Sequence, residues 1–290
     1  MLPLQAEGLL YIGREKRDRI CAMRCFILLA ASAATIFAQT APPNSAGVSL
    51  GHIHLTVPDP DATQKLWADL LGGQTMSAGP LQLVKLPGIF IIVSKAMPTA
   101  GTTNSVVNHI GFEVKDYPGL KAKVEATMPG KWRELTPNVQ AFLSMPDDIT
   151  VEIMENKDLK TPSAFHHIHE SVADPKAAQA WYIKEFGAGD GSRRNLPAAM
   201  MPGGEVDFLS SAGRGGKAPA AMPEPTKGRA LDHIGFEVKD LDAIMKKMAA
   251  DGVTINMPFR DMTKQIGLKI AFVTDPNGTY IELTEGLAAK

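Results

Sequence analysis

Histidines and glutamates recur at matching places in this chain of 290 residues. The octapeptide His-Ile-Gly-Phe-Glu-Val-Lys-Asp occurs twice, at His109–Asp116 and at His233–Asp240. About 40 to 50 residues after each copy comes a strand-like segment with a glutamate, Glu152 in the first case and Glu282 in the second. Imidazole and carboxylate groups bind divalent metals. The repeat therefore points to metal chemistry, present in duplicate.

Side-chain alternation along a strand decides which of these residues can meet. Within each octapeptide the isoleucine, phenylalanine and valine share one face, which we expect to pack under helices. The histidine, glycine and glutamate share the other face. In the two later segments the alternation places Glu152 and Glu282 on this non-core face as well. Glu113 and Glu237, inside the octapeptides, also face this side, where we expect solvated or supporting roles.

The repeat extends upstream of the octapeptides. His52-Ile53-His54 resembles His167-Ile168-His169, which lies 115 positions later. The duplicated unit therefore runs from about His52 to Glu152 and again from His167 to Glu282. Each half of a unit opens with a His-led strand followed by a helix. The chain is thus interpreted as four quarter-motifs that make two domains.

Each domain then carries two imidazoles and one carboxylate on the non-core face of a sheet. With positions left open for water and substrate, such a set suits Fe(II), Mn(II), Zn(II) or Ni(II). The same placement in both repeats favours a metal site over ordinary polar surface residues. We expect one or two divalent ions per chain as cofactors.

The first 38 residues differ in kind from the rest. Basic residues at positions 14 to 24 precede the short apolar run Phe26–Ala38, which ends in a small residue. These are the parts of a secretory signal, and the run is too short to span a membrane. Met23 suits the start of such a signal, which makes Met1–Ala22 a candidate for a misassigned upstream start. We expect an exported protein, periplasmic or secreted, without a membrane segment once the signal is removed; a buried N-terminal helix is the alternative.

Composition narrows the function further. Both cysteines, Cys21 and Cys25, lie in this first segment, so we expect a mature chain without a disulfide and without thiolate chemistry. Residues 1–38 carry five of the 30 basic and three of the 31 acidic residues, which leaves 25 against 28, a net charge of −3. Nothing in that balance suggests nucleic acid or an anionic membrane surface as a partner.

The remaining length suits two domains, placed at 48–156 and 164–286 with 157–163 as a linker.

Residues 187–229 are rich in Gly, Pro, Ala and Met. Within them Glu205–Leu209 is a plausible strand, and Ser211–Gly228 has the composition of a long flexible loop.

Four strand openings and one closing phrase resemble those of the vicinal oxygen chelate superfamily, which includes glyoxalase I, extradiol dioxygenases, fosfomycin-resistance proteins and bleomycin-binding proteins. The openings are GHIHLTV, NHIGFEV, HHIHESV and DHIGFEV, and the closing phrase is DPNGTYIELTE. The resemblance covers roughly residues 48–286. It implies an α+β fold of four βαβββ motifs, paired into two glyoxalase-like domains, each a U-shaped mixed sheet around a metal. The ligands would come from the first and last strands of each motif.

Carried over by position, the resemblance implies two histidines and one glutamate as metal ligands in each domain: His52, His109 and Glu152 in the first, and His167, His233 and Glu282 in the second. The fourth ligand position of the second domain is best matched by Asp207. The fourth position of the first domain falls at about Ile91, which cannot bind a metal. The first set is similar to the dioxygenase pattern and the second to the glyoxalase pattern.

Two further histidines, His54 and His169, lie two residues beyond the first ligand on the same face. A neutral imidazole there can act as general base toward a chelated substrate, or it can simply line the cavity. Arg193, Arg194 and Lys269 are candidates for contact with an anionic substrate, with solvated charges as the alternative.

The sequence thus predicts an exported, divalent-metal-dependent enzyme that acts on a small molecule chelated through neighbouring oxygens. The reaction would be that of an extradiol-type dioxygenase or of a glyoxalase-like lyase or isomerase, and the two-His, one-carboxylate sets favour the dioxygenase. The alternative is a non-catalytic protein of the bleomycin-resistance type that sequesters a small molecule. A monomer or a homodimer is expected.

Overall fold

The computed structural model describes residues 40–212 and 222–290 of the chain. The predicted signal, residues 1–38, lies outside the described residues, as do residues 213–221 of the predicted flexible loop. None of the helices within the described ranges is long and apolar enough to span a membrane.

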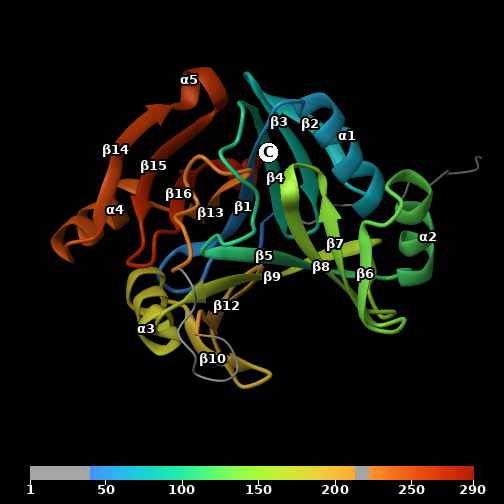
Figure 1. Ribbon diagram of the computed structural model, residues 1–290. Coiled ribbons are helices and arrows are strands. Elements are labelled where there is room, and N and C mark those ends of the chain that lie inside the picture. Colours follow the sequence, from blue (N-terminus) through green and yellow to red (C-terminus); the bar gives the residue numbers. More distant parts are fainter. Residues whose placement is uncertain (1–39, 213–221) are drawn as a thin grey trace, which may run out of the picture. The chain divides into compact units, whose positions relative to one another are not determined.

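The described chain consists of four successive motifs, each with one strand, one helix and three further strands (Figure 1). Motif 1 contains β1 (Val48–Val57), α1 (Pro60–Leu71), β2 (Gln74–Ala78), β3 (Leu81–Leu86) and β4 (Ile89–Lys95). Motif 2 contains β5 (Val107–Val114), α2 (Tyr117–Thr127), β6 (Trp132–Thr136), β7 (Gln140–Met145), the 3-10 turn η1 (Pro146–Asp148) and β8 (Ile149–Glu155).

The second half of the chain repeats this order. Motif 3 contains β9 (Ser163–Val172), α3 (Pro175–Phe186), β10 (Gly189–Arg193), β11 (Leu196–Met201) and β12 (Gly204–Ser210). Motif 4 contains β13 (Leu231–Val238), α4 (Leu241–Ala250), β14 (Thr254–Met262), the short α5 (Thr263–Ile266), β15 (Leu268–Thr274) and β16 (Tyr280–Glu285), and ends in the 3-10 turn η2 (Leu287–Ala289).

An aspartate starts each of the four long helices. Its carboxylate accepts a hydrogen bond from a backbone N–H in the first turn, which satisfies a donor that the helix itself leaves unpaired. The four caps are Asp59, Asp116, Asp174 and Asp240. Two of the helices, α1 and α3, end at glycines with left-handed backbone, Gly72 and Gly187. These local signals fix where each motif turns from strand to helix and back.

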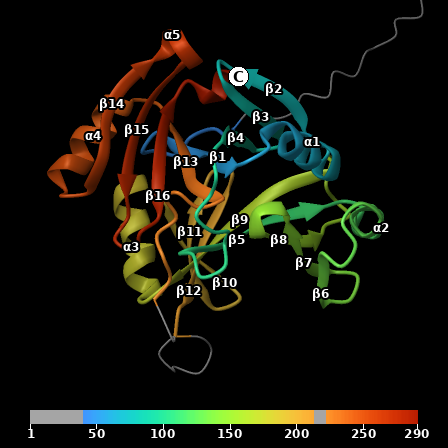
Figure 2. The same cartoon turned by 45° about the horizontal axis from the view of Figure 1, so that its top comes forward.

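The motifs form two eight-stranded mixed sheets, and they pair out of chain order (Figures 1 and 2). Motifs 1 and 4 form the first sheet, here called sheet 1/4, with strand order β14-β15-β16-β13-β1-β4-β3-β2. Motifs 2 and 3 form sheet 2/3, with order β10-β11-β12-β9-β5-β8-β7-β6. The α+β fold of four βαβββ motifs in two mixed sheets is confirmed.

Chain order predicts that the motifs pair within 48–156 and within 164–286, and this pairing is wrong. Segment 157–163 joins β8 to β9, two strands of the same sheet, and β9 returns antiparallel to β5 from the pair Val114 and Ser163 onward. The strands β5 and β13 carry the same octapeptide, so either of them could pair with β1 or with β9. The short connection from β8 to β9 keeps motifs 2 and 3 together, so β9 pairs with β5 and β13 pairs with β1.

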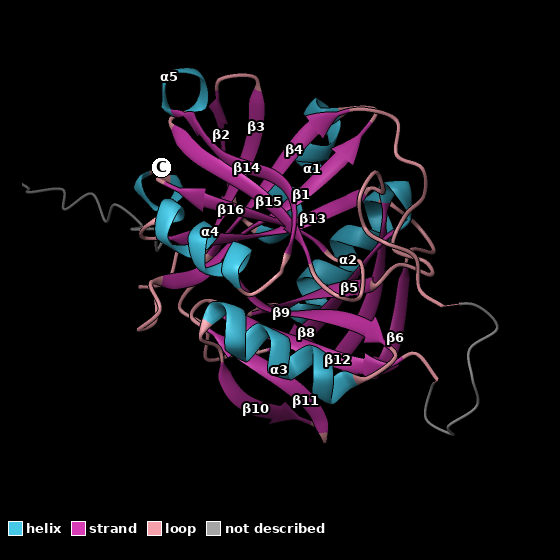
Figure 3. Cartoon of the chain, turned by 90° about the vertical axis from the view of Figure 1, so that its left-hand side faces the viewer, coloured by secondary structure: helices cyan, strands magenta, loops and turns pink. Residues whose placement is uncertain are grey.

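One apolar core joins both sheets on their helix-bearing faces. Trp67 of α1 packs edge-on against Phe112 of β5, with ring centroids 6.2 Å apart. Phe186 of α3 stacks on Phe236 of β13 at 4.2 Å. Single aromatic residues of these helices therefore reach strands of the other sheet. The helix α3 itself runs beside β11 and β12 of its own sheet (Figure 3). The opposite face of each sheet, which we call its cup face, is left free to carry polar groups.

A buried carboxyl on the core side also links the two sheets. Glu170 of β9 is fully buried, and its Oε1 accepts hydrogen bonds from Tyr182 of α3 at 2.6 Å and from Thr279, next to β16, at 2.8 Å. Its Oε2 has no hydrogen-bond partner among the described residues. Burial, with the nearby charge of Asp275, raises the pKa of Glu170 well above its usual range.

This carboxyl predicts a pH-dependent effect on stability. Above about pH 4.5 the unfolded chain loses the Glu170 proton while the folded chain keeps it, so the wild type loses stability as pH rises. Glu170→Gln does not titrate. We expect the variant to be more stable than wild type at pH 7 by about 1 kcal/mol or more, and the difference to vanish near pH 4. Urea unfolding at both pH values measures it.

Glu185→Gln is the matched control, since Glu185 is equally buried but contacts Lys247 at 2.7 Å and Lys184 at 3.1 Å. It should not gain stability at pH 7. An equal gain in both variants would contradict the account given for Glu170.

Candidate metal centres

In each sheet a histidine, a glycine and a glutamate lie side by side on three neighbouring strands. In sheet 1/4 His52 of β1 pairs with Gly235 of β13, which pairs with Glu282 of β16. Because the middle residue has no side chain, the imidazole extends across the central strand. His52 Nε2 lies 2.9 Å from Glu282 Oε2.

The same row recurs in sheet 2/3. There His167 of β9 pairs with Gly111 of β5, which pairs with Glu152 of β8. His167 Nε2 lies 3.1 Å from Glu152 Oε2. A Cβ built on Gly111 would overlap the His167 ring, and one built on Gly235 would overlap the His52 ring. The octapeptide glycine thus makes room for the imidazole of the partner strand.

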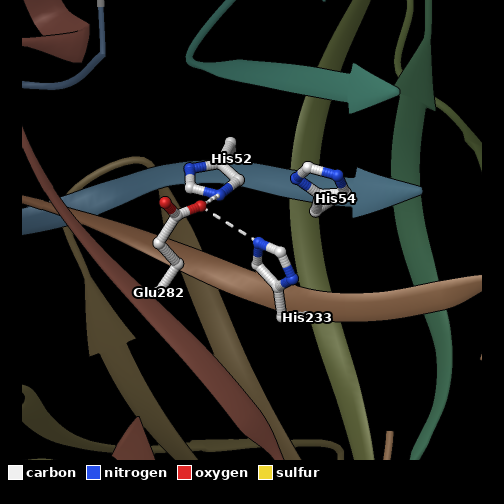
Figure 4. Close-up of side chains that lie close together, drawn as sticks. All are labelled: His52, His54, His233 and Glu282. Atoms are coloured by element: carbon white, nitrogen blue, oxygen red, sulfur yellow. Dashed lines mark hydrogen bonds and ion pairs between the residues drawn. The ribbon is translucent and has the colours of Figure 1, made fainter. Parts of the chain in front are cut away.

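Four side chains converge on the cup face of sheet 1/4 and form site 1/4: His52, His54, His233 and Glu282 (Figure 4). His233 Nε2 lies 3.0 Å from the same carboxylate oxygen that contacts His52. The ring of His54 lies 4.3 Å from the ring of His233, and its Nε2 lies 3.0 Å from Ser94 Oγ.

Site 2/3 repeats this arrangement with His109, His167, His169 and Glu152. His109 Nε2 lies 3.1 Å from Glu152 Oε2, and the ring of His169 stacks on that of His109 with centroids 4.4 Å apart. The other oxygen of Glu152 accepts a hydrogen bond from the Gln140 amide. His109, His169, Glu152 and Gln140 line a cavity of about 310 Å³.

Both glutamates are held ionised by their histidines. Burial alone would raise the pKa of Glu282, but the hydrogen bonds and charges of His233 and His52 outweigh it and place the pKa below its ordinary value. Glu152 is shifted the same way by His109 and His167. Burial in turn lowers the pKa of His167 to about 3, so this imidazole is neutral at pH 7.

The residue before each octapeptide histidine distinguishes the two sites. Asp232 Oδ1 lies 2.6 Å from His233 Nδ1, and Asn108 Oδ1 lies 2.8 Å from His109 Nδ1. The Asp232 and Glu282 contacts outweigh burial and raise the pKa of His233, whereas burial lowers the pKa of His109 beside a neutral amide. Both contacts hold the proton on Nδ1 and leave Nε2 facing the glutamate, as metal-binding histidines require.

Both groups fit a divalent metal. His52 Nε2 and His167 Nε2 are buried and, within the described residues, have no partner in hydrogen-bonding geometry. Buried polar atoms are rarely left unpaired in this way. Each lies next to an ionised carboxylate and a second imidazole, and two nitrogens with one carboxylate oxygen are a donor set for Zn(II), Fe(II), Mn(II) or Ni(II).

The structure gathers most of the predicted site residues but groups them differently. The sets expected from chain order were His52, His109 and Glu152 in one domain, and His167, His233 and Glu282 in the other. Since the motifs pair as 1 with 4 and 2 with 3, His109 and Glu152 meet His167, and His52 meets His233 and Glu282. The two predicted general bases, His54 and His169, lie in these groups. Metal binding and catalysis themselves stay predictions.

Asp207 is outside both four-residue groups. It pairs with His169 in the β12–β9 register, and its Oδ2 lies 3.2 Å from His169 Nε2 and 3.2 Å from Arg193 Nη1. At the equivalent place beside His54, β4 carries Ile92, one residue from the predicted Ile91. Asn108, Asp232 and Gln140 were not among the predicted site residues. Their signals were the position directly before each histidine and, for Gln140, the face it shares with Phe142.

Comparison with known proteins agrees with this architecture. The family model described as Glyoxalase/Bleomycin resistance protein/Dioxygenase superfamily matches residues 49–283. The crystal structure of glyoxalase I from Zea mays aligns with a TM-score of 0.62 and 16% identity, over 83% of this chain and 94% of that chain. A Bacillus subtilis structure provisionally described as a dioxygenase aligns with a TM-score of 0.59 and 13% identity, over 86% of both chains. At these identities the likeness shows the fold alone. No curated protein matches the sequence.

The crossing of each imidazole over a glycine predicts a specific effect of a single methyl group. Gly111→Ala should displace the His167 ring and Gly235→Ala the His52 ring. We expect each to cost about 1–3 kcal/mol, as for other overpacked sites. Urea unfolding measures the cost, and the imidazole NMR signals show which histidine moves.

Gly189→Ala, on β10, is the control, because a Cβ there meets its nearest neighbour, Met200 Cβ, at an ordinary 3.4 Å. Unchanged imidazole signals in Gly111→Ala and Gly235→Ala would refute this role of the glycines.

Proposed function

Because the chain belongs to the Glyoxalase/Bleomycin resistance protein/Dioxygenase superfamily, we propose that it is an exported, divalent-metal-dependent enzyme of the extradiol-dioxygenase type. Its substrate would be a small molecule that binds through two neighbouring oxygens. The observation that carries this proposal is the pair of two-His, one-Glu groups on the cup faces, each with the ring of an additional histidine close beside one of the proposed ligands.

The geometry of site 2/3 supports the catalytic part of this proposal. His109, His167 and Glu152 would hold the ion, and Gln140 keeps the Glu152 carboxylate in place. When bound, a divalent ion supplies Lewis acidity to neighbouring substrate oxygens. The cavity beside the group is also lined by the apolar residues Phe142, Leu196 and Leu209.

His169 is the proposed general base. Its Nε2 faces the Asp207 carboxylate, which holds a proton on that nitrogen. Its Nδ1 has no hydrogen-bond partner among the described residues, and this is the atom that would accept the substrate's hydroxyl proton. His54 has the corresponding position in site 1/4, where its Nε2 contacts the hydroxyl of Ser94 and not a carboxylate.

Asp207 also favours a second candidate function, that of a glyoxalase-like lyase or isomerase. It is the best match to the fourth ligand position that the family resemblance implies, and it pairs with His169 in the sheet. If the carboxylate turned from Arg193 toward the group, site 2/3 would have two histidines and two carboxylates. The dioxygenase remains the first choice because the described geometry pairs Asp207 with Arg193 and His169.

The basic residues and the apolar run within residues 1–38 support the export of the protein. N-terminal sequencing of protein recovered from a periplasmic fraction tests it, and a mature chain that begins near Gln39 is expected.

Metal content is the first test of the proposed function. We expect up to two equivalents per chain by inductively coupled plasma mass spectrometry. His52→Ala and His233→Ala should each remove about one equivalent, and the double variant should remove no more than either alone. His109→Ala and His167→Ala should behave in the same way for the other site. If the motifs paired in chain order instead, the double variant His52→Ala/His109→Ala would lose no more metal than either single variant. No uptake after reconstitution would leave the non-catalytic binding protein as the interpretation.

Oxygen dependence separates the two reaction classes. An iron-loaded dioxygenase should consume oxygen with catechol-type substrates in an oxygen electrode and stop under anaerobic conditions. His169→Ala should slow turnover about 100-fold or more at unchanged metal content, since a positioned base contributes at least that factor. Turnover without oxygen, with nickel or zinc bound, would instead identify the lyase or isomerase.

A further inference from the structure

The internal repeat allows the two cups to be compared position by position. The hairpin β2–β3 closes with the pair Ala78 and Leu81, and β10–β11 closes with Arg193 and Leu196. Arg193 therefore takes the place of Ala78, and Arg194, the next residue, takes that of Gly79. Both arginines are thus additions of motif 3.

The facing strands differ in the same sense. Phe272 pairs with Glu282 and Phe142 pairs with Glu152, so Gln140 of β7 takes the place of Ile270 of β15. Asp207 likewise takes the place of Ile92. The cup of sheet 2/3 is therefore polar at four positions where the cup of sheet 1/4 has an apolar residue or a glycine.

In sheet 1/4 these positions are covered by an apolar cluster that includes the end of the chain. Leu287 of η2 is fully buried against residues from both arms of the sheet, among them Phe90, Ile92 and Leu268. Glu237 fixes η2, because its Oε1 accepts hydrogen bonds from the backbone N–H groups of Gly286 and Ala288. Figures 1 and 2 show the C-terminus beside the strands of motif 1. The chain itself therefore occupies much of this cup.

In sheet 2/3 the corresponding space is the cavity of about 310 Å³, and Arg193 and Arg194 both line it. Arg193 is already engaged, since its Nη1 contacts Asp207 Oδ2 at 3.2 Å and His167 Nδ1 at 2.6 Å. Arg194 is exposed, and its Nη1 donates to the Gln140 carbonyl at 3.3 Å. It forms no ion pair with a carboxylate in the described part of the chain.

Backbone strain at the same place positions Arg194. Its φ is +47°, and that of the following Asn195 is +69°. The left-handed region is unfavourable for an arginine, yet here it turns the β10–β11 hairpin so that the side chain lines the cavity. From Arg194 a chain of hydrogen bonds runs through Gln140 to Glu152, which belongs to the metal group.

We propose that the cup of sheet 2/3 is the ligand-binding cup of this protein and that its ligand is a small organic anion, whose carboxylate or phosphate is bound by Arg194. The guanidinium presents several donors to such an oxyanion. The chelating oxygens of the same molecule would lie at site 2/3, and in this respect the inference rests on the proposed function. Arg194 is then the residue that selects acidic over neutral substrates.

Anion binding to the metal-free protein tests this directly. Inorganic phosphate and acetate are titrated separately by isothermal titration calorimetry at low ionic strength. We expect one site per chain, weakened at least tenfold in Arg194→Gln and weakened by added salt. Tighter binding of phosphate would indicate a phosphate ester as the natural ligand, and tighter binding of acetate a carboxylate.

Arg260→Gln is the matched control, because Arg260 is an exposed arginine on β14 of the other sheet. It removes the same charge and should leave binding unchanged. Arg194→Lys should retain part of the affinity, and thermal unfolding should show that all variants fold. Equal loss of affinity in Arg194→Gln and Arg260→Gln, or none in either, would overturn the proposal.

The same measurements distinguish a failure of the anion site from a failure of the proposed function. Metal uptake without binding of either anion overturns the assignment of Arg194 and leaves the metal enzyme intact. Anion binding that depends on Arg194, in a protein that takes up no metal, supports the anion site and overturns the metal enzyme.

Discussion

The absence of one side chain on a central strand determines where both candidate centres form. Gly111 and Gly235 each let an imidazole from the antiparallel neighbour reach over the strand to a glutamate on its far side. A side chain at either glycine would fill the space that the ring occupies. The histidine and the carboxylate lie on strands that are not neighbours, so they could then no longer meet. The third ligand, His109 or His233, comes from the same strand as the glycine, so register alone brings three strands to one point.

This constraint also explains why the centres do not follow chain order. Each centre needs one motif that supplies the glycine and glutamate, and a partner motif that supplies the crossing histidine. Motifs 2 and 4 carry the glycine-bearing octapeptide, whereas motifs 1 and 3 carry the His-x-His segment. Either octapeptide could pair with either His-x-His strand. The short segment 157–163 commits motif 2 to motif 3, and motifs 1 and 4 at the two ends of the described chain then pair with each other.

Much of this was readable from the sequence, because strand alternation assigns faces without knowledge of pairing. The four motifs and the faces of the histidines and glutamates follow from local patterns. The partner of each His-led strand does not, since two identical octapeptides compete for it. The strands β10 and β11 were also not predicted, because Gly189–Arg193 and Leu196–Met201 have few β-branched residues. The pairing of β10 with β11 and of β11 with β12, together with the packing of α3 against them, holds them in the sheet. Because β10 was not predicted, the contact of Arg193 with Asp207 could not be predicted either.

Charge around the shared ligand pattern sets the two centres apart. At site 1/4 the Asp232 carboxylate adds a negative charge behind His233, which favours a dication at the facing Nε2. At site 2/3 a neutral amide stands behind His109, and Arg193 donates to His167 Nδ1. A guanidinium can only donate, so it leaves the proton of this neutral imidazole on Nε2, the atom that faces Glu152. A metal bound there would have to displace that proton and lie beside a fixed positive charge, which would lower the affinity of the site for the metal and make this affinity depend on pH. The same arginines make the open cup attractive to an anion, and an anion held there would offset their charge on the ion. At site 2/3 a bound metal and an acidic ligand would therefore each increase the affinity for the other. At site 1/4 the Asp232 carboxylate already supplies the negative charge.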